Sequence, residues 1–455
     1  MPVTVVILAA GQGKRMRSDL PKVLQPLAGR PLLAHVLERA PGLEPAAIHV
    51  VYGHGADQLR TAFGEEDLRW CLQTEQLGTG HAVAQALPGV PDDHNVLVLF
   101  GDVPLIRVAT LRTLSARAES ADLVLLTASL PDPTGYGRIL RDAGGRVVGI
   151  VEEKDATDEQ RRISETNAGV MIAGAGQLRR WIASLSNDNA QGEYYLPDVV
   201  AMAVAEGASV AAIKIDDSEE VLGINDKSEL AAAERSLQQA RARELMNAGA
   251  TLADPARVDV RGRVTVDGDV FIDVGAVFEG EVELARGVRI GPNCTIRDSR
   301  LGPDCVVHAN TVMDGVTAGA SCVLGPFAHL RPGTELAERV KVGNFVEIKN
   351  SHIGSGTKIS HLSYVGDATV GKDVNIGAGT ITCNYDGVSK HRTTIGDNAS
   401  IGSGVMLVAP VEVGEAATIG AGSTISKDAP GATLTVARSR QVEISGWRGP
   451  GKEPR

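Results

Sequence analysis

The stretch "IGSGVMLVAPVEVGEAATIGAGSTI", residues 401–425, carries an aliphatic residue at every sixth position: Ile401, Leu407, Val413, Ile419 and Ile425. Glycine or another small or polar residue often follows the aliphatic one. This period matches neither an amphipathic α-helix nor the simple alternation of a β-strand. It is the hexapeptide repeat of a parallel β-helix, in which each aliphatic side chain points into the bore and small residues fit the tight corners.

The same repeat begins near residue 255 and fills most of the C-terminal half. Successive coils of such a helix lie about 4.8 Å apart, so the backbone of each pairs with the next. The further predicted inward positions are Val260, Val266, Ile272, Phe278, Leu284, Ile290, Ile296, Leu324, Leu330, Leu336, Val342, Ile348, Ile353, Ile359, Val365 and Ile395.

The five cysteines form no C-x-x-C pair and have no histidine at zinc spacing. Cys294, Cys305 and Cys322 each stand four residues after an inward position, in the slot for a small residue. We therefore interpret the cysteines, with Cys71 and Cys383, as structural thiols in a reducing compartment.

The repeat is interrupted by "TCNYDGVSKHRT", residues 382–393, which carries several polar and charged side chains. A loop ejected from so regular a coil is expected to reach a ligand or a neighbouring subunit.

Residues 1–226 alternate short apolar runs of strand character with stretches of helical spacing. This alternation predicts a mostly parallel sheet covered on both faces, with ligands at the carboxyl ends of its strands. The predicted strands are "VTVVILAA" (3–10), "AAIHVVYG" (46–53), "NVLVLFGD" (95–102) and "ADLVLLTASL" (121–130), and the helical stretches include "PLLAHVLERAPGL" (31–43) and "GHAVAQALPGV" (80–90).

The first strand runs into "LAAGQGKRM", residues 8–16, a candidate phosphate loop. A P-loop would need glycine and then Ser or Thr where Leu8 and Arg15 stand, and a dinucleotide fingerprint would need a third glycine at Met16. The loop is therefore a nucleotide loop of another kind.

Residues 227–248 are rich in Ala, Leu, Glu, Arg and Gln without Pro or Gly, which predicts a helix ended by Gly249. We interpret it as a rigid joint. The predicted organisation is an α/β domain over 1–227, a helical linker over 228–248 and a β-helix with a C-terminal tail over 249–455.

The chain has 455 residues and a formal net charge of −11, which argues against nucleic acid as a bulk partner. No apolar run has the length of a membrane span, and the N-terminus lacks a basic region followed by a cleavable apolar one. We therefore expect a cytoplasmic protein that does not associate with membranes.

Several motifs together resemble a known family. "LAAGQGKRMRSDLPK" (8–22) resembles the loop L-x-x-G-x-G-T-x-M-x4-P-K of sugar-1-phosphate nucleotidylyltransferases. The whole chain resembles the bacterial bifunctional N-acetylglucosamine-1-phosphate uridyltransferases / glucosamine-1-phosphate acetyltransferases, which act in peptidoglycan and lipopolysaccharide precursor synthesis. The supporting stretches are "EQLGTGHAV" (75–83), "FGDVPL" (100–105), "PTGYGRI" (133–139), "IVEEKDA" (150–156), "TNAGV" (166–170), "HLSYVGDA" (361–368) and "NIGAGTITCNYDG" (375–387).

The resemblance implies a Rossmann-like nucleotidyltransferase domain followed by a left-handed parallel β-helix. It also implies uridylyl transfer from UTP, with Arg15 and Lys22 neutralising phosphate charge. Asp102 follows an apolar strand, a suitable place for a Mg²⁺ ligand, and Asn225 of "GIND" would be the second. The implied UTP and UDP-N-acetylglucosamine contacts are Leu8, Ala9, Ala10, Gly11, Lys22, Gln73, Gly78, Thr79, Phe100, Gly101, Asp102, Gly137, Glu152, Asn167 and Asn225.

For the second reaction, acetyl transfer from acetyl-CoA, His361 stands two residues after the inward Ile359 and can face outward at a corner. The resemblance implies that it is the general base and that the enzyme is a homotrimer. It assigns glucosamine-1-phosphate to Arg331, Lys349, Tyr364 and Asn375, and acetyl-CoA to Ala378, Asn384, Tyr385, Ser403, Ala421 and Arg438.

Two positions depart from the family pattern: Lys14 replaces its usual Thr, and Phe100 stands where Tyr often precedes Gly-Asp. Three other functions fit part of the pattern. They are a single-function nucleotidylyltransferase with a purely oligomerising β-helix, a non-catalytic scaffold, and transfer of another base to another sugar. The presence of Lys22, Asp102, Asn225 and His361 argues against the scaffold, and the acetyltransferase motifs argue against another sugar.

Overall fold

The computed structural model describes residues 1–11, 13–53, 55–64 and 66–447. The chain folds as two compact units, Met1–Leu237 and Gln238–Arg455. The predicted helix is confirmed as α8 (Lys227–Asn247), and the boundary between the units falls inside it. Gly249 follows with a φ of 103°, a conformation that suits glycine at a helix end. Residues 448–455 of the predicted tail lie outside the described residues.

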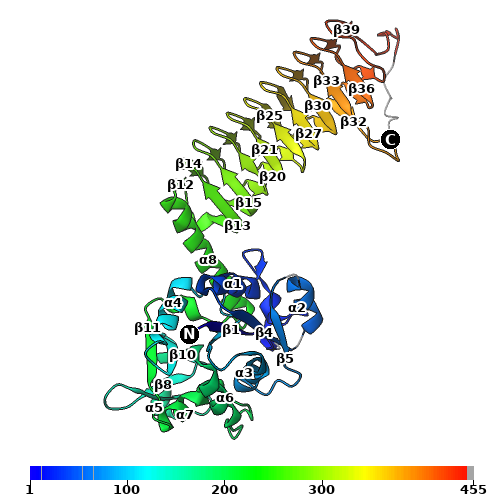
Figure 1. The fold of residues 1–455 in the computed structure, drawn as a ribbon. Helices are drawn as coiled ribbons and strands as arrows, with labels where there is room; N and C mark the ends of the chain where they lie inside the picture. The colour runs from blue at the N-terminus through cyan, green and yellow to red at the C-terminus, as the bar shows by residue number, and fades with distance from the viewer. Residues whose placement is uncertain (12, 54, 65, 448–455) are drawn as a thin grey trace, which may run out of the picture. The chain divides into compact units, whose positions relative to one another are not determined.

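The first unit is an α/β sandwich around one twisted sheet of order β11-β7-β10-β6-β1-β4-β5 (Figure 1). The strands are β1 (Val3–Leu8), β4 (Ala47–Tyr52), β5 (Arg69–Leu72), β6 (Asn95–Phe100), β7 (Leu123–Ser129), β8 (Arg138–Arg141), β9 (Val147–Val151), β10 (Glu165–Gly174) and β11 (Val210–Ile215), besides the small pair β2 (Pro26–Leu27) and β3 (Arg30–Pro31). The helices are α1 (Leu32–Arg39), α2 (Ala56–Phe63), α3 (Thr79–Ala86), α4 (Val108–Arg117), α5 (Asp158–Arg161), α6 (Ala175–Ala183) and α7 (Val199–Ala205).

The four predicted strands are confirmed as β1, β4, β6 and β7, and two predicted helical stretches as α1 and α3. Strand β1 pairs in parallel with β4 and β6, as do β4 with β5 and β7 with β11. Strand β10, which the sequence did not predict, lies antiparallel between β6 and β7. The main path of the sheet is therefore parallel apart from β10, and β8 and β9 extend the sheet beside β10 through further antiparallel pairs.

Alternate residues of β1 enter two separate hydrophobic clusters, as expected for a strand buried on both faces. Val5 and Ile7 pack with residues of α1, α2 and α4 on one face. Val6 and Leu8 pack with residues of α3, α6 and α7 on the other. This packing holds the carboxyl ends of β1 and β6 side by side.

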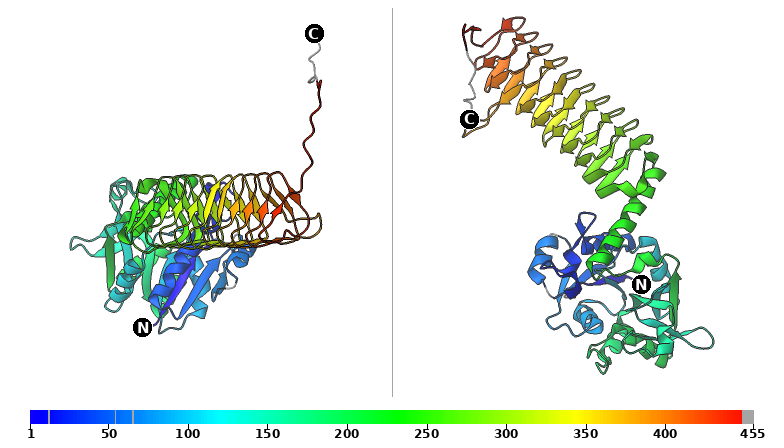
Figure 2. Two further views of the ribbon diagram at one scale, coloured as in Figure 1. Left: turned by 90° about the horizontal axis from the view of Figure 1, so that it is seen from above. Right: turned by 180° about the vertical axis from the view of Figure 1, so that it is seen from behind.

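The second unit is a left-handed parallel β-helix whose coils stack along one axis (Figures 1 and 2). One face is an 11-stranded parallel sheet. Its strands are β12 (Ala250–Leu252), β14 (Val270–Ile272), β16 (Arg289–Ile290), β19 (Val306–Val307), β22 (Val323–Leu324), β25 (Lys341–Asn344), β28 (Lys358–His361), β31 (Asn375–Ile376), β34 (Ser400–Ile401), β37 (Thr418–Ile419) and β39 (Leu434–Thr435).

The rest of each coil belongs to a 17-stranded sheet. Its strands are β13 (Val258–Val266), β15 (Ala276–Leu284), β17 (Thr295–Arg297), β18 (Arg300–Leu301), β20 (Val312–Asp314), β21 (Val316–Ala318), β23 (His329–Leu330), β24 (Thr334–Leu336), β26 (Glu347–Lys349), β27 (Ser351–Ile353), β29 (Tyr364–Gly366), β30 (Ala368–Val370), β32 (Ile381–Cys383), β33 (Thr393–Ile395), β35 (Met406–Val408), β36 (Val411–Val413) and β38 (Thr424–Ile425).

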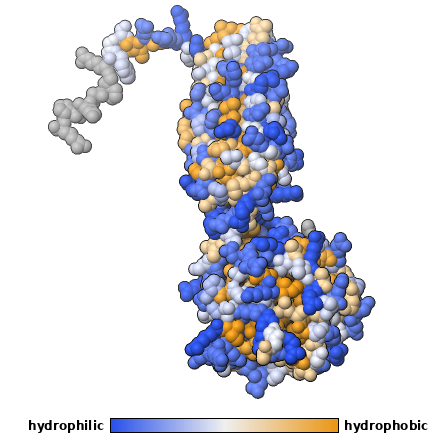
Figure 3. All heavy atoms as spheres, turned by 90° about the vertical axis from the view of Figure 1, so that its left-hand side faces the viewer, coloured by the Kyte–Doolittle hydropathy of each residue, from blue (hydrophilic) through white to orange (hydrophobic). Residues whose placement is uncertain are grey.

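The predicted inward aliphatic residues form one continuous core, with Val266 only partly buried against it. The side chains of Cys294, Cys305 and Cys322 are buried in this core, which confirms them as packing residues. The sulfur of Cys305 lies 2.9 Å from the carbonyl oxygen of Gly319. The outward positions give a surface on which apolar patches lie among polar side chains (Figure 3). Among the described residues, no helix is both long enough and apolar enough to cross a membrane.

The repeat predicts that truncating one inward side chain destabilises the β-helix, while truncating its outward neighbour does not. Ile296 on β17 is fully buried, and Thr295 beside it points to the other face of the strand. We expect Ile296→Ala to lower the free energy of unfolding by about 2–5 kcal/mol, because it leaves a cavity in the bore. The measurement is the urea midpoint followed by circular dichroism. Equal midpoints for Ile296→Ala and the control Thr295→Ala would contradict the inward assignment.

Candidate active sites

A cavity of about 890 Å³ opens at the carboxyl ends of β1 and β6 in the α/β unit. Ten of the predicted nucleotide contacts line it: Leu8, Ala9, Ala10, Gly11, Lys22, Gln73, Gly78, Thr79, Phe100 and Asp102. Gly101 is buried beneath the loop, where its N–H donates to the Leu8 carbonyl oxygen at 2.9 Å. Gln76 also lines the cavity, and its amide donates to the Ala10 carbonyl oxygen at 3.0 Å, a loop contact that the sequence did not predict.

Gln73 is fixed at one wall of this cavity. Its side chain is buried, and its amide nitrogen lies 3.2 Å from the Gly78 carbonyl oxygen and 3.0 Å from His81 Nδ1. Because these acceptors engage its N–H groups, the amide oxygen is the group left to accept from a ligand such as a uracil ring. Gly78 has a φ of 106°, and a Cβ there would lie 2.7 Å from the Tyr194 carbonyl oxygen, so this turn requires glycine.

Lys22, Asp102 and Asn225 meet at one point. Lys22 Nζ forms an ion pair with Asp102 Oδ2 and donates to Asn225 Oδ1 at 3.3 Å. The two oxygens predicted to bind magnesium therefore already converge on one cation, the lysine ammonium. One carboxylate and one amide oxygen, with phosphate and water oxygens completing the shell, suit Mg²⁺. The described residues contain no cluster of three or more His, Cys, Asp or Glu side chains that could hold a metal by themselves.

Arg15 lies in a smaller cavity of about 270 Å³, lined by Gly13, Lys14, Arg15, Lys22 and Asn225. The structure thus groups Arg15 with Lys22, as predicted, and adds Lys14. Lys14 and Lys22 line both this cavity and the larger one.

A third cavity, of about 260 Å³, is lined by Gly137, Glu152 and Asn167, three further predicted UDP-N-acetylglucosamine contacts that the resemblance assigns to the sugar, and we call it the sugar cavity. It shares Thr79, Phe100 and Asp102 with the nucleotide cavity. The backbone N–H of Asn167 donates to the Gly137 carbonyl oxygen at 2.8 Å. Phe100 packs against Gly169, where a Cβ would lie 2.7 Å from the ring. Burial raises the pKa of the Glu152 carboxyl, and the nearby Asp198 and Asp155 carboxylates add to this effect.

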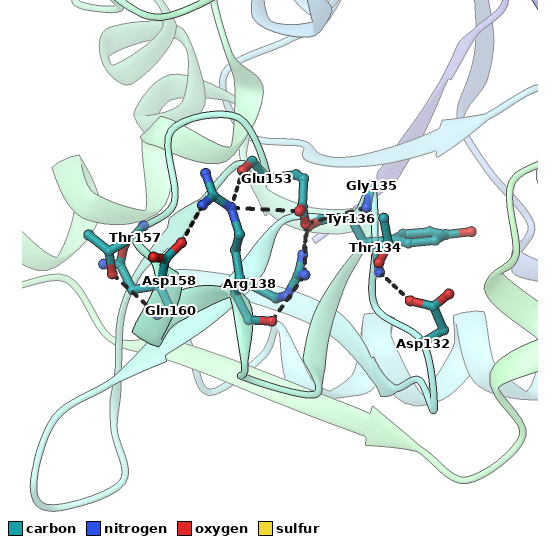
Figure 4. A network of polar contacts seen from close by, with 10 residues as sticks. Asp132, Thr134, Gly135, Tyr136, Arg138, Glu153, Thr157, Asp158 and Gln160 are labelled. Atoms are coloured by element: carbon teal, nitrogen blue, oxygen red, sulfur yellow. Dashed lines mark hydrogen bonds and ion pairs between the residues drawn. The ribbon is translucent and has the colours of Figure 1, made fainter.

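Figure 4 shows the network of polar contacts around Glu153, the residue that follows Glu152 in the chain. Glu153 forms a 2.7 Å ion pair with Arg138, whose side chain is buried. Arg138 also donates to the Tyr136 carbonyl oxygen, and the N–H of Gly135 lies 3.4 Å from Glu153. This network fixes the turn before β8 that leads to Gly137. The sequence did not predict the role of Arg138, because a single arginine after Gly-Tyr-Gly carries no sign that it is buried.

In the β-helix unit, His361 and three of the six predicted acetyl-CoA residues share one position on successive coils. His361, Ala378, Ser403 and Ala421 each stand two residues after an inward isoleucine, and the strands that carry those isoleucines pair in register. Arg438, beyond the last coil, donates to the Ala421 carbonyl oxygen at 2.6 Å. The shared position places these four residues in one row, in which His361 is followed by three small side chains.

His361 is exposed at the end of β28, as predicted, and Asn344 on the preceding coil holds its ring. His361 Nδ1 lies 2.8 Å from Asn344 Oδ1. Because that oxygen can only accept, Nδ1 carries the proton and Nε2 is left as the basic nitrogen. Asn344 was not predicted, because its partner lies 17 residues along the chain and only the coil register brings the two together.

Arg331 and Lys349 occupy equivalent positions on neighbouring coils, since Leu330 pairs with Ile348 immediately before them. The next residue in this row is Gly366, where a Cβ would lie 2.3 Å from the Tyr364 hydroxyl. The absence of a side chain at Gly366 therefore lets the Tyr364 hydroxyl complete a row with the guanidinium and the ammonium. The structure thus groups three of the four predicted sugar-phosphate residues. Asn375 instead lies at the start of β31, paired with Lys358.

The ejected loop brings a further cation to this row. The ammonium of Lys390 is the main cause of a lowered pKa at Lys349, and Arg331 adds to it. The backbones of Lys390 and Tyr385 pair in an isolated antiparallel β-bridge across the loop. Tyr385 is exposed. The sequence identified the loop but gave Lys390 no role, although it is the loop's only lysine.

The carboxylate of Asp367 lies close to the residues of this row and of the ejected loop and holds them through hydrogen bonds and charge. Its carboxylate accepts from the amide of Asn350 at 2.5 Å and from the amide of Asn384, and Asn384 Nδ2 also lies 3.5 Å from the Tyr364 hydroxyl. Burial works to raise the pKa of Asp367, but these hydrogen bonds and the ammonium groups of Lys390 and Lys349 outweigh it, so the pKa is lowered. Asp367 is therefore a buried carboxylate that positions Asn384 and balances two cations.

Comparison with known proteins follows the same division. Residues 5–167 match the MobA-like NTP transferase domain, and residues 392–427 match the bacterial transferase hexapeptide (six repeats). Over 452 residues the chain is 59% identical to the bifunctional protein GlmU of Alkalilimnicola ehrlichii, covering 99% of this chain and 97% of the relative. It is 58% identical to that of Azoarcus sp. and 55% identical to that of Marinobacter nauticus, with 99% of each chain covered.

An NTP transferase domain followed by transferase hexapeptide repeats identifies the chain as a transferase built from two units of different kinds. The full-length identity is specific within this class. The chain belongs to the bifunctional GlmU family.

The position of Asp367 predicts a change in the pH dependence of acetyl transfer. In Asp367→Asn, Lys349 loses the carboxylate that raises its pKa, while Lys390 and Arg331 still lower it. Lys349 then loses its proton at a lower pH than in the unaltered protein. We expect the alkaline decline of kcat/KM for glucosamine-1-phosphate to move to lower pH, with kcat/KM itself reduced about tenfold by the weaker hydrogen bonds to Asn384.

The matched control is Asp373→Asn, an exposed aspartate in the same left-handed backbone conformation, with a φ of 54° against 50° for Asp367. It is expected to leave both the pH profile and the rate unchanged. A uniform loss of activity for Asp367→Asn without a displaced profile would contradict the electrostatic role.

Proposed function

We propose that the α/β site performs the uridylyl transfer and the β-helix site the acetyl transfer by which the family makes UDP-N-acetylglucosamine. The chain is a bifunctional enzyme that acts on small molecules, with UTP and acetyl-CoA as co-substrates. In domain terms, residues 1–227 carry the uridyltransferase, 228–248 the linker, and 249–455 the acetyltransferase. The observation that carries the proposal is the grouping of the predicted residues into cavities and rows within each unit.

In the first reaction, the amine nitrogen of glucosamine-1-phosphate attacks the thioester carbonyl of acetyl-CoA. A C–N bond forms, the C–S bond breaks, and coenzyme A leaves as the thiol. His361 Nε2 takes the proton from the amine, while Arg331, Lys349, Lys390 and the Tyr364 hydroxyl bind the phosphate. Asn375, Asn384, Tyr385, Ala378, Ser403, Ala421 and Arg438 are the further contacts proposed for this site.

In the second reaction, a phosphate oxygen of N-acetylglucosamine-1-phosphate attacks the α-phosphorus of UTP. The new P–O bond forms as the bond to the β-phosphate breaks, and pyrophosphate leaves. The protein's task is to hold two anions together, so positioning and charge neutralisation carry the catalysis. Arg15 and Lys22 bind phosphates, and Asp102 and Asn225 would hold a Mg²⁺ ion, which supplies positive charge to the phosphate oxygens.

Both activities are tested in one coupled assay that contains glucosamine-1-phosphate, acetyl-CoA, UTP and Mg²⁺. Acetyl transfer is read as free thiol. Uridylyl transfer is read as pyrophosphate, and for each variant it is also read with N-acetylglucosamine-1-phosphate supplied directly, so that it does not depend on the first step. We expect His361→Ala to lower acetyl transfer about 10²–10⁴-fold and to leave uridylyl transfer unchanged. We expect Lys22→Ala to do the reverse by about 10²-fold, and chelation of Mg²⁺ to abolish uridylyl transfer alone. Acetyl transfer that survives His361→Ala would contradict the base assignment, and absence of acetyl transfer in the unaltered protein would leave the β-helix as an oligomerising element.

We propose in addition that the chain forms a homotrimer through its β-helix. Phe327, Phe345 and Leu362 form an apolar ridge at one corner of successive coils. The exposed fractions of these residues are 50%, 56% and 61%, respectively. The rings of Phe327 and Phe345 stack at 5.5 Å. All three residues have positive φ, which costs about 1–2 kcal/mol for a residue with a side chain. Leu362 directly follows His361, so a second copy covering the ridge would lie against that histidine.

The ridge predicts that a charge at its centre dissociates the oligomer. We expect Phe345→Glu to give the mass of one chain by light scattering, where the unaltered protein gives three, and to lose acetyl transfer but not uridylyl transfer. The control is Val148→Glu, which places the same charge on an exposed apolar position of β9 in the other unit. A trimer that persists in Phe345→Glu would place the interface elsewhere.

A further inference from the structure

The smaller cavity of the α/β unit has an unusual charge balance. Of the five residues that line it, Lys14, Arg15 and Lys22 are cationic, and Gly13 and Asn225 are neutral. The protein as a whole carries a net charge of −11, so this local excess of positive charge opposes the general field. A concave site with three cations and no lining carboxylate binds an anion of high charge.

The backbone holds Lys14 in this place. Gly13 has a left-handed conformation with a φ of 60°, and a Cβ there would lie 2.6 Å from Lys22 Cβ. Glycine therefore lets the loop pass directly beside Lys22. The following turn, η1 (Lys14–Met16), is closed by the N–H of Met16 donating to the Gly13 carbonyl oxygen at 2.9 Å, and the Met16 side chain is buried in the unit.

The three cations are not equally available. The ammonium of Lys22 is already paired with Asp102. Among the described residues, neither Lys14 nor Arg15 has a carboxylate within 4.0 Å. Two uncompensated cations therefore face the cavity, and Lys14 also lines the nucleotide cavity that it adjoins. The positive charge of the nucleotide cavity thus extends into the smaller cavity.

We propose that Lys14 binds the pyrophosphate part of the nucleoside triphosphate, and the pyrophosphate released from it, as a third cation beside Arg15 and Lys22. The inference rests on the proposed uridylyl transfer. As the bond between the α- and β-phosphates breaks, its electron pair passes to the leaving pyrophosphate, and the added charge lies in the cavity that Lys14 lines. The related loops have threonine at this position, which donates one hydrogen bond without a charge. This chain therefore holds pyrophosphate more tightly than a threonine at position 14 would.

The test measures binding of pyrophosphate to the full chain by calorimetry in the presence of Mg²⁺. We expect Lys14→Thr to weaken pyrophosphate binding about fivefold, the effect of one nearby charge in water, and Lys14→Arg to restore it. UDP-N-acetylglucosamine has no pyrophosphate leaving group, so its affinity is expected to change by less than about twofold. The KM for pyrophosphate in the reverse reaction rises with the dissociation constant, and the KM for the sugar nucleotide does not.

The matched control is Arg17→Gln. Arg17 follows the same turn and is exposed, but it lines neither cavity, and its removal changes the net charge by the same amount. The proposal is overturned by unchanged pyrophosphate affinity in Lys14→Thr, by an equal loss in Arg17→Gln, or by an equal loss of affinity for UDP-N-acetylglucosamine. These binding measurements need no turnover. A chain that bound pyrophosphate through Lys14 yet made no UDP-N-acetylglucosamine would refute the proposed function and not the anion site.

Discussion

Hydrogen bonding between successive coils is the constraint on which the β-helix unit depends. Because the backbone of each coil pairs with the next in a fixed register, one position of the repeat becomes a row along the unit. The inward position gives the continuous aliphatic core. The position two residues later gives the row that begins at His361, and the position after Leu330 and Ile348 gives the row of Arg331 and Lys349. The same coil register thus aligns the inward residues that form the core and, one or two residues later, the outward residues proposed to form the site.

The α/β unit reaches a comparable result through the parallel pairing of β1 and β6. Their carboxyl ends lie together, so the loop after β1 and Asp102 after β6 face one cavity. Asp102 also lines the sugar cavity, while its ion-pair partner Lys22, and Asn225, which accepts from Lys22, line the smaller basic one. Asp102 therefore lies at the junction of the nucleotide and sugar cavities and is tied through Lys22 to the smaller one, which is the junction that the proposed transfer between two bound anions would use.

The sequence predicted the elements that a regular hydrophobic period or a motif at the end of a strand identifies. It identified the inward aliphatics, the first parallel strands, α8 and the interruption of the repeat. It missed contacts that depend on register across many residues, such as Asn344 with His361 and Asp367 with Asn384. It also missed β10, because "TNAGV" is a binding motif whose small residues do not alternate as a strand does. The buried Arg138 was missed because burial of a charge is a property of its partners, here Glu153 and the Tyr136 carbonyl oxygen.

Both phosphate sites share a physical device. In each, a lysine proposed to bind phosphate lies close to a carboxylate: Lys22 to Asp102, and Lys349 and Lys390 to Asp367. The negative charge of the carboxylate lowers the electrostatic free energy of holding the cations close together, because it offsets their mutual repulsion. It also sets a limit on affinity, because an incoming phosphate has to compete with it for the same ammonium. In the part of the chain that the structure describes, Lys14 and Arg15 have no such carboxylate within 4.0 Å, so the cavity proposed to receive the leaving group is the one where positive charge is least restrained.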